Sequence, residues 1–164
     1  TGYAGDYVDN QIIKEVQSKY NGAQITKDMA RRWKEQHSFV STGAPEEPVL
    51  VDFSIDGKAM TLDITDCIQR ACESIVDPIV ENVKVLIAES NPEYHDEFRK
   101  NMVLAGGGSS IRGLGALIER RLSDMGDVNV HVVDDPVRLG AMGGLRLAME
   151  VPEEMWKNLT LASR

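Results

Sequence analysis

Apolar residues recur at helical spacing in the first part of the chain. Their spacing of four residues places them on one face of a helix over about 6–20. The pair Asn21-Gly22 follows and tolerates the left-handed backbone conformation that commonly ends a helix. A second, shorter helix is predicted over about 27–36. The apolar stripe of the first helix consists of Val8, Ile12, Val16 and Tyr20.

An Asp-Gly pair separates two runs that have the character of β-strands. A segment punctuated by Pro and Gly over 41–48 is expected to be an exposed loop, and it leads into the first run at 49–53. The second run covers 59–64. Two extended runs around Asp56-Gly57 predict a β-hairpin.

A long apolar stripe follows the hairpin and predicts a helix that stops at Asn91-Pro92. Thr65 or Asp66 is expected to cap the start of this helix. Pro78 lies inside the pattern, so it is expected to kink the helix or divide it into two pieces. The stripe consists of Ile68, Cys72, Ile75, Ile79, Val83 and Leu86.

The second half of the chain alternates between strand and helix patterns. Asp135-Pro136 is expected to open the last helix, as an N-cap followed by Pro at the first helical position. This order favours an α/β layer with parallel strands, preceded by a small α/β lobe made of the first two helices and the hairpin. The predicted elements are a buried strand at 101–105, a helix at 113–125, a strand at 128–133 and a helix ending near 150.

Length and charge exclude several classes of protein. The 164 residues are enough to bury one good-sized core, in one domain or in two small lobes. The chain carries 18 Lys+Arg against 26 Asp+Glu, a formal net charge of −8, so dense positive charge for nucleic acid is absent. No apolar run approaches the ~20 residues of a membrane span, and charges interrupt the first apolar stretch. We therefore expect no nucleic-acid partner, no direct membrane insertion and no signal peptide.

The sequence offers no clear metal site. Cys67 and Cys72 have a spacing that suits neither a disulfide nor a zinc site, so we expect reduced and mostly buried thiols. The three histidines are scattered and form no metal-binding motif. Asp134 and Asp135 are adjacent carboxylates, but a capping role explains Asp135 more simply than a metal does.

The sharpest local feature is the glycine loop, residues 106–110 (GGGSS), at the carboxyl end of a predicted strand. Three glycines remove every Cβ there, which lets a ligand approach the backbone, and ligands of open α/β sheets bind at such ends. Specific motifs fail, because Ile111 breaks G-x-G-x-x-G and Leu114-Gly115 replace the Lys and Ser/Thr of a P-loop. Two interpretations remain: a site for a nucleotide-type ligand, or a tight turn without a ligand.

A second candidate lies on the helix predicted over 27–36. Lys34 and Glu35 stand beside Trp33, one turn after Arg31 and Arg32. Spacing alone predicts that these charges form a solvated basic face, which is the usual fate of such a run.

Several runs together resemble the bacterial actins. Residues 102–114 and 130–136 resemble the adenosine motif of that superfamily and the segment after it. The runs 4–9, 34–40 and 152–156 are similar to those of the actins of magnetosome filaments. The resemblance covers essentially the whole chain, in the expected order. Because the glycine motif is shared with chaperone ATPases and sugar kinases, a lobe of such a non-filament ATPase is the alternative.

The resemblance implies an actin-like, ribonuclease H-like fold, ATP binding, and polymerisation into filaments that organise magnetosomes in the cytoplasm. The partners it implies are further copies of the chain, with magnetosome-associated regulators beside them. Lys34 and Glu35 match positions that face adenine and ribose, Gly5 matches a backbone position near the sugar, and Ile111 lies near the base. The residues it assigns to nucleotide binding are Gly5, Lys34, Glu35, Gly106, Gly107, Gly108, Ser109 and Ile111.

The two phosphate loops of the family, each an Asp-containing glycine hairpin, have no match in this sequence. The residues that orient the hydrolytic water and hold Mg²⁺ belong to those elements, so no catalytic or metal-binding residue is expected here. Phosphoryl transfer depends on positioning and charge neutralisation. We therefore expect a fragment that is not a competent ATPase alone, with ATP or ADP and Mg²⁺ bound in the intact parent.

The expected fold is an incomplete α/β, actin-like ATPase lobe. Residues 1–64 are expected to form a small inserted α/β subdomain, of which 1–6 end the preceding large-lobe segment. Residues 65–164 are expected to form a large-lobe subdomain that carries the glycine loop. A sheet that lacks neighbours exposes unpaired strand edges, so the chain is expected to self-associate.

Overall fold

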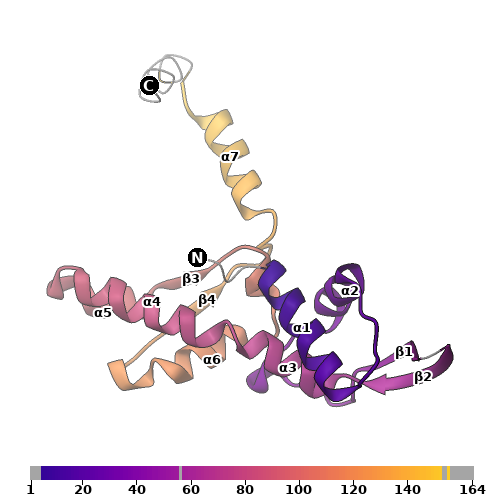
Figure 1. The fold of residues 1–164 in the computed structure, drawn as a ribbon. Helices are drawn as coiled ribbons and strands as arrows, with labels where there is room; N and C mark the ends of the chain where they lie inside the picture. Colours follow the sequence, from indigo (N-terminus) through magenta and orange to yellow (C-terminus); the bar gives the residue numbers. More distant parts are fainter. Residues whose placement is uncertain (1–4, 56, 153–154, 156–164) are drawn as a thin grey trace.

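Two small sheets organise the chain, one in each half (Figure 1). The computed structural model describes residues 5–55, 57–152 and 155. The predicted hairpin is confirmed, because the first two strands pair antiparallel, and the predicted parallel layer is confirmed by the other two. The strands are β1 (Leu50–Ile55), β2 (Lys58–Asp63), β3 (Met102–Leu104) and β4 (Val130–Val132).

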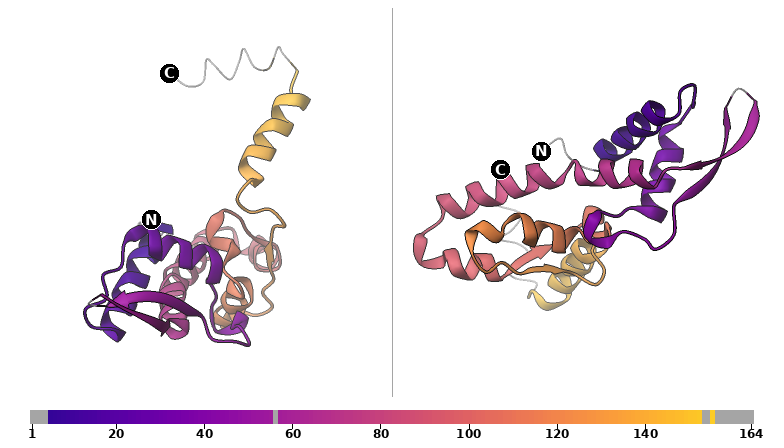
Figure 2. Two further views of the ribbon diagram at one scale, coloured as in Figure 1. Left: turned by 90° about the vertical axis from the view of Figure 1, so that its right-hand side faces the viewer. Right: turned by 90° about the horizontal axis from the view of Figure 1, so that it is seen from below.

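The described residues form seven helices besides these sheets. In Figures 1 and 2, α3 and α4 form a long rod, with α1, α2 and the hairpin at one of its ends, while α7 projects away from the other elements. Short 3₁₀ turns cover Ser41–Gly43, Pro92–Tyr94, Gly107–Ser110 and Ser123–Met125. The helices are α1 (Gly5–Lys19), α2 (Lys27–His37), α3 (Thr65–Glu73), α4 (Val76–Glu89), α5 (His95–Lys100), α6 (Leu114–Arg121) and α7 (Leu139–Glu150).

One continuous hydrophobic core joins the two halves. Val8, Ile12 and Val16 of the predicted stripe are buried, as expected, and belong to one core with apolar side chains of α2 and α3. Tyr20, the last residue of the stripe, follows α1 and is half-buried. Phe39 and Val40, which follow α2, are fully buried and connect this group to the apolar face of α6. Burial of apolar area is the main driving force of folding, so these contacts fix how α6 and the glycine loop before it sit against α2.

The long helix predicted after the hairpin is divided into two pieces, as predicted, at the residues one turn before Pro78. The break falls at Ser74-Ile75, and Pro78 occupies the first turn of α4, where the missing N–H is tolerated. The prediction that Thr65 or Asp66 caps this helix is wrong, because α3 begins at Thr65 without a side-chain cap. Asp63 instead accepts hydrogen bonds from the amide and the hydroxyl of Thr65, at 3.0 and 2.6 Å.

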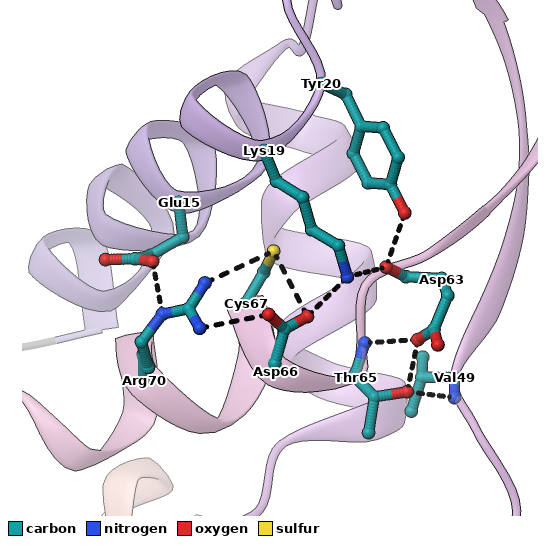
Figure 3. A network of polar contacts seen from close by, with 9 residues as sticks. All are labelled: Glu15, Lys19, Tyr20, Val49, Asp63, Thr65, Asp66, Cys67 and Arg70. Carbon is teal, nitrogen blue, oxygen red and sulfur yellow. Dashed lines mark hydrogen bonds and ion pairs between the residues drawn. The ribbon is translucent and has the colours of Figure 1, made fainter.

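A polar network fastens α1 to α3 (Figure 3). Arg70 lies between Glu15 and Asp66, with its Nε 2.6 Å from Glu15 Oε2 and its Nη1 3.0 Å from Asp66 Oδ2. Lys19 Nζ lies 2.6 Å from Asp66 Oδ1 and donates to the carbonyl of Asp63. The pKa of Asp66 is held below its usual value, chiefly by the hydrogen bond from Lys19. These linked charges hold α1 against α3.

The second half differs from its prediction in three respects. The strand predicted as buried at 101–105 is partly exposed, since the side chain of Val103 is 61% exposed. Val132 of the neighbouring strand β4 is 45% exposed. Helical structure at 92–100 was not predicted, since its short elements are too brief to show an apolar period. The helix predicted at 113–125 is shorter, with a 3₁₀ turn after α6.

The start of the last helix is also corrected. α7 begins at Leu139 with no side-chain cap, so Pro136 is not its first helical residue. The carbonyl of Pro136 accepts a hydrogen bond of 2.9 Å from the amide of Gly106 and is thereby engaged with the glycine loop. Asp135 caps the preceding turn instead, accepting from the Arg138 amide at 3.3 Å. Tertiary pairing of this segment therefore overrides the local helix-start signal.

The remaining expectations concern the cysteines, the metal motifs and the membrane. Cys67 and Cys72 are buried free thiols, as predicted, and burial raises the pKa of each to about 11. In the residues that the structure describes, no group of three or more His, Cys, Asp or Glu side chains could hold a metal ion. None of the helices drawn from those residues has the length and apolarity to cross a membrane. Ala4 and Trp156, parts of two resembling runs, lie outside the described residues.

Candidate functional site

The glycine loop is an exposed turn with open space beside it. Gly106 adopts a φ of +85°, which only glycine takes readily, and it starts the 3₁₀ turn Gly107–Ser110. A Cβ built on Gly106, Gly107 or Gly108 would meet nothing within 4 Å. Within the described part of the chain, the amides of Gly107 and Gly108 donate no hydrogen bond outside the turn. These donors and the free space fit the approach of a polar ligand.

Two of the predicted site residues serve the turn and the core. The Ser109 side chain is buried, and its hydroxyl donates to the Gly106 carbonyl at 2.8 Å, so it closes the turn. Ile111 is only 5% exposed and belongs to the hydrophobic core. Ser109 therefore closes the turn of the glycine loop, and Ile111 anchors the segment after it in the core.

The segment directly after the glycine loop pairs with the segment that follows α2. The Val40 amide donates to the Arg112 carbonyl at 3.0 Å, and the Arg112 amide donates to the Ser38 carbonyl at 3.2 Å. The backbones of Gly43 and Gly113 then pass so closely that a Cβ on Gly43 would lie 2.5 Å from Arg112 O. This pairing holds the glycine loop and α2 together as one unit.

Lys34 lies on α2 one turn before this pairing, and it is not solvated as spacing alone predicts. Its side chain is 17% exposed, and its Nζ lies 2.6 Å from Asp9 Oδ1. The same ammonium donates to the carbonyl of Gly5 at 3.0 Å. The structure thus brings Lys34 and Gly5 together at the start of α1.

Glu35 behaves as the spacing predicts. It is exposed, and within the described residues no hydrogen bond or ion pair involves its side chain. Arg31 and Arg32 are exposed as well. The basic-face interpretation therefore holds for these neighbours and is wrong for Lys34 alone.

Asp9 is the residue that sequence reasoning missed. It is completely buried, and its Oδ2 also lies 3.7 Å from Nε of Arg31. A signal existed in the sequence, because Asp9 stands three residues before Ile12 and seven before Val16, on the buried face of α1. A carboxylate on an apolar stripe requires a partner, and here the partner is Lys34.

A pocket of about 560 Å³ borders the glycine loop at Ser109 and Ser110. Its walls come from residues 109–116, from Glu119 on α6, and from the β4 segment with Asp134 and Pro136. Glu119 accepts a hydrogen bond from the Val130 amide at 2.7 Å, which fastens α6 to β4 at this wall. This pocket therefore adjoins the turn on the side of α6 and β4.

Comparison with known proteins identifies the family of the chain. Residues 2–155 match the family model described as MreB/Mbl protein. The chain belongs to the MreB/Mbl family. The expected actin-like fold is confirmed, and the resemblance to magnetosome-filament actins is supported by relatives of that kind.

Two curated relatives are MamK proteins. The chain is 38% identical over 156 residues to the actin-like protein MamK of Paramagnetospirillum magneticum, covering 95% of this chain and 44% of the relative. It is 36% identical over 156 residues to MamK of Magnetospirillum gryphiswaldense, covering 95% and 43%. The chain therefore spans less than half of the length of these MreB/Mbl relatives.

Solved structures show the same fold. A MamK double-helical filament superposes with a TM-score of 0.86 at 38% identity, over 93% of this chain and 46% of that one. A non-polymerising MamK mutant bound to AMPPNP gives 0.81 at 39% identity, over 90% and 45%. MreB 5 of Spiroplasma citri gives 0.75 at 18% identity, over 99% and 47%, which supports the fold alone.

Proposed function

We propose that this chain is part of a bacterial actin that binds ATP or ADP and forms filaments with copies of itself. The observation that carries the proposal is the TM-score of 0.86 against a MamK filament over 93% of the chain. The family match favours this function over the alternative of a sugar-kinase or chaperone lobe. Following the sequence resemblance, we place the filaments along magnetosomes in the cytoplasm.

The proposed nucleotide site lies between the start of α1, Lys34 on α2 and the exposed glycine loop. Support comes from the open space at Gly106, Gly107 and Gly108, and from the pairing that holds this loop to α2. The AMPPNP bound to a MamK relative supports an adenine nucleotide as the ligand. Glu35 is proposed to contact the ribose from the exposed face of α2, and Ile111 to support the base from below.

Hydrolysis is proposed to require more than these residues. Phosphoryl transfer needs charged groups and a metal ion around the phosphates. The residues described in the structure hold no cluster of three metal-binding side chains, and the sequence lacks a match to the family's phosphate loops. We propose that residues 1–64 act as the small subdomain and residues 65–164 as a large-lobe subdomain. Because the phosphate loops are not among these residues, we propose that the two subdomains alone do not hydrolyse ATP.

Nucleotide binding is tested with Gly107→Val and a matched control. A side chain at Gly107 projects into open space, so the variant keeps the fold and fills the position of the ligand. Gly140 of α7 also meets nothing within 4 Å, so Gly140→Val is the control. Fluorescence titration with mant-ATP is expected to show binding by the unchanged chain and the control, with at least tenfold weaker binding by Gly107→Val. Equal affinities for all three would overturn the site.

Self-association is tested on the same samples. Each two-stranded sheet leaves strand edges unpaired, and the exposed Val103 and Val132 lie on β3 and β4. Sedimentation velocity is expected to show oligomers whose fraction rises with protein concentration. A range of about 10–200 μM spans weak association. A single monomer boundary throughout would contradict filament formation by this chain.

A further inference from the structure

The ion pair between Asp9 and Lys34 joins α1 to α2 and also places the Lys34 ammonium. Asp9 is fully buried, and its carboxylate oxygens accept no hydrogen bond of regular geometry from any described residue. Lys34 Nζ at 2.6 Å and Arg31 Nε at 3.7 Å are the cations that meet its charge. A buried pair with so few supporting hydrogen bonds adds little net stability, because desolvation offsets the attraction. The main effect of the ion pair is therefore on the position of the Lys34 ammonium.

Two contacts hold the Lys34 ammonium beside the start of α1. Its ammonium has three N–H donors, of which one faces the Gly5 carbonyl and one faces Asp9. A Cβ on Gly5 would lie 3.1 Å from Nζ, so a side chain at this position would displace the ammonium slightly from the backbone. The third donor remains for a ligand.

Electrostatics explains why Asp9 is needed for this arrangement. Lys34 Nζ lies beside the first residue of α1, where the helix dipole presents positive potential and disfavours a cation. Arg31 adds a second positive charge close to the pair. Without the carboxylate of Asp9, both effects would push the ammonium away from Gly5 and towards water.

We infer that Asp9 is a positioning residue, which fixes the Lys34 ammonium at Gly5 so that its third N–H meets a neutral acceptor of the ligand. The Asp9 carboxylate cancels the charge of Lys34, so the group presented is a directed donor and not a free cation. Such a donor suits a ribose hydroxyl or a purine nitrogen better than a phosphate. This inference rests on the proposed nucleotide binding at the site.

The test is a double-mutant cycle on ligand affinity. Asp9→Asn keeps the shape and removes the charge, and Lys34→Met keeps the length of the stem and removes the ammonium. The probe is mant-ADP, titrated at low and high salt, with thermal melting to verify that each variant is folded. Asp6→Asn is the control, because Asp6 lies on the same helix and pairs with the same Arg31 while being exposed.

Each single variant is expected to bind mant-ADP roughly tenfold more weakly, which is the usual effect of losing a charge-assisted hydrogen bond. The double variant is expected to lose no more than either single one, because Asp9 acts through Lys34. An additive loss of about a hundredfold, or an unchanged affinity for Asp9→Asn, overturns the inference. A salt dependence of the affinity that Lys34→Met removes also overturns it, since it would mean that Lys34 meets a phosphate.

A second readout does not depend on the ligand. Acetylation of Lys34 by a water-soluble active ester, followed by mass spectrometry, is expected to be at least fivefold faster in Asp9→Asn than in the unchanged chain and in Asp6→Asn. If the unchanged chain fails to bind mant-ADP, the proposed function fails for this chain and the acetylation rate alone decides the role of Asp9. Equal acetylation rates would then overturn the positioning.

Discussion

The close passage of Gly43 and Gly113 gives the sharpest prediction of stability. Gly113 precedes α6 with a φ of +81°. A Cβ added there would lie 2.7 Å from Thr42 Oγ1 and still closer to the Gly43 amide nitrogen. Gly113→Ala therefore combines an unfavourable backbone conformation with a steric clash in the segment that joins α2 to the glycine loop.

The expected magnitude follows from these two contributions. The left-handed conformation costs a non-glycine residue roughly 1–2 kcal/mol. Overpacking against backbone atoms that cannot rotate away costs about 1–3 kcal/mol. Reduced freedom of the unfolded chain returns about 0.4–1 kcal/mol. Gly113→Ala is thus expected to lower the free energy of unfolding by about 3 kcal/mol.

Two other glycines separate the contributions. Gly57 has a φ of +77° and nothing within 4 Å of an added Cβ, so Gly57→Ala measures the backbone contribution alone, about 1 kcal/mol. Gly43 lacks a positive φ but its Cβ would lie 2.5 Å from Arg112 O, so Gly43→Ala measures the clash alone, about 2 kcal/mol.

Urea unfolding followed by circular dichroism measures all three variants. With a slope of about 2 kcal/mol per molar urea, the midpoint is expected to fall by about 1.5 M for Gly113→Ala and by about 0.5 M for Gly57→Ala. If Gly113→Ala is no less stable than Gly57→Ala, the close approach between the two segments is refuted.

Three further predictions concern the core, the thiols and the response to acid. Phe39 is fully buried, so Phe39→Ala is expected to lower the free energy of unfolding by about 3–5 kcal/mol in the same urea assay, and a change under 1 kcal/mol would contradict its core position. Burial raises the pKa of Cys67 and Cys72 to about 11, so iodoacetamide at pH 8 is expected to label them only in urea, and rapid labelling without urea would show that they are accessible. Hydrogen bonds from Thr65 hold the pKa of Asp63 below 3.8; the stability that they add is present above that pH and is lost as the pH falls through the folded value. Thr65→Val is expected to flatten the decrease of the urea midpoint below pH 4, and an unchanged profile would argue against this coupling.

Elements with a strong local pattern could be predicted from the sequence. The apolar stripe of α1, the helix α2 and the hairpin around Gly57 have nearly the predicted bounds. Their periods are set by residues close in sequence, so local geometry is enough to reveal them. The starts of α3 and α7 were not predicted correctly, because Asp63 and Asp135 act on turns that are stabilised by contacts with distant segments.

For the candidate site, the sequence by itself determined the glycine loop, the α/β order around it and the family resemblance. These are properties of residue order, because a run of three glycines and the spacing of apolar residues need no partner to be visible. Only the tertiary structure decided that α2 and the glycine loop meet through Val40 and Arg112, and that Lys34 is held by Asp9 beside Gly5. Asp9 and Lys34 are far apart in sequence, and they meet only once α1 and α2 have packed together, because the packing buries the carboxylate and a buried carboxylate requires a partner.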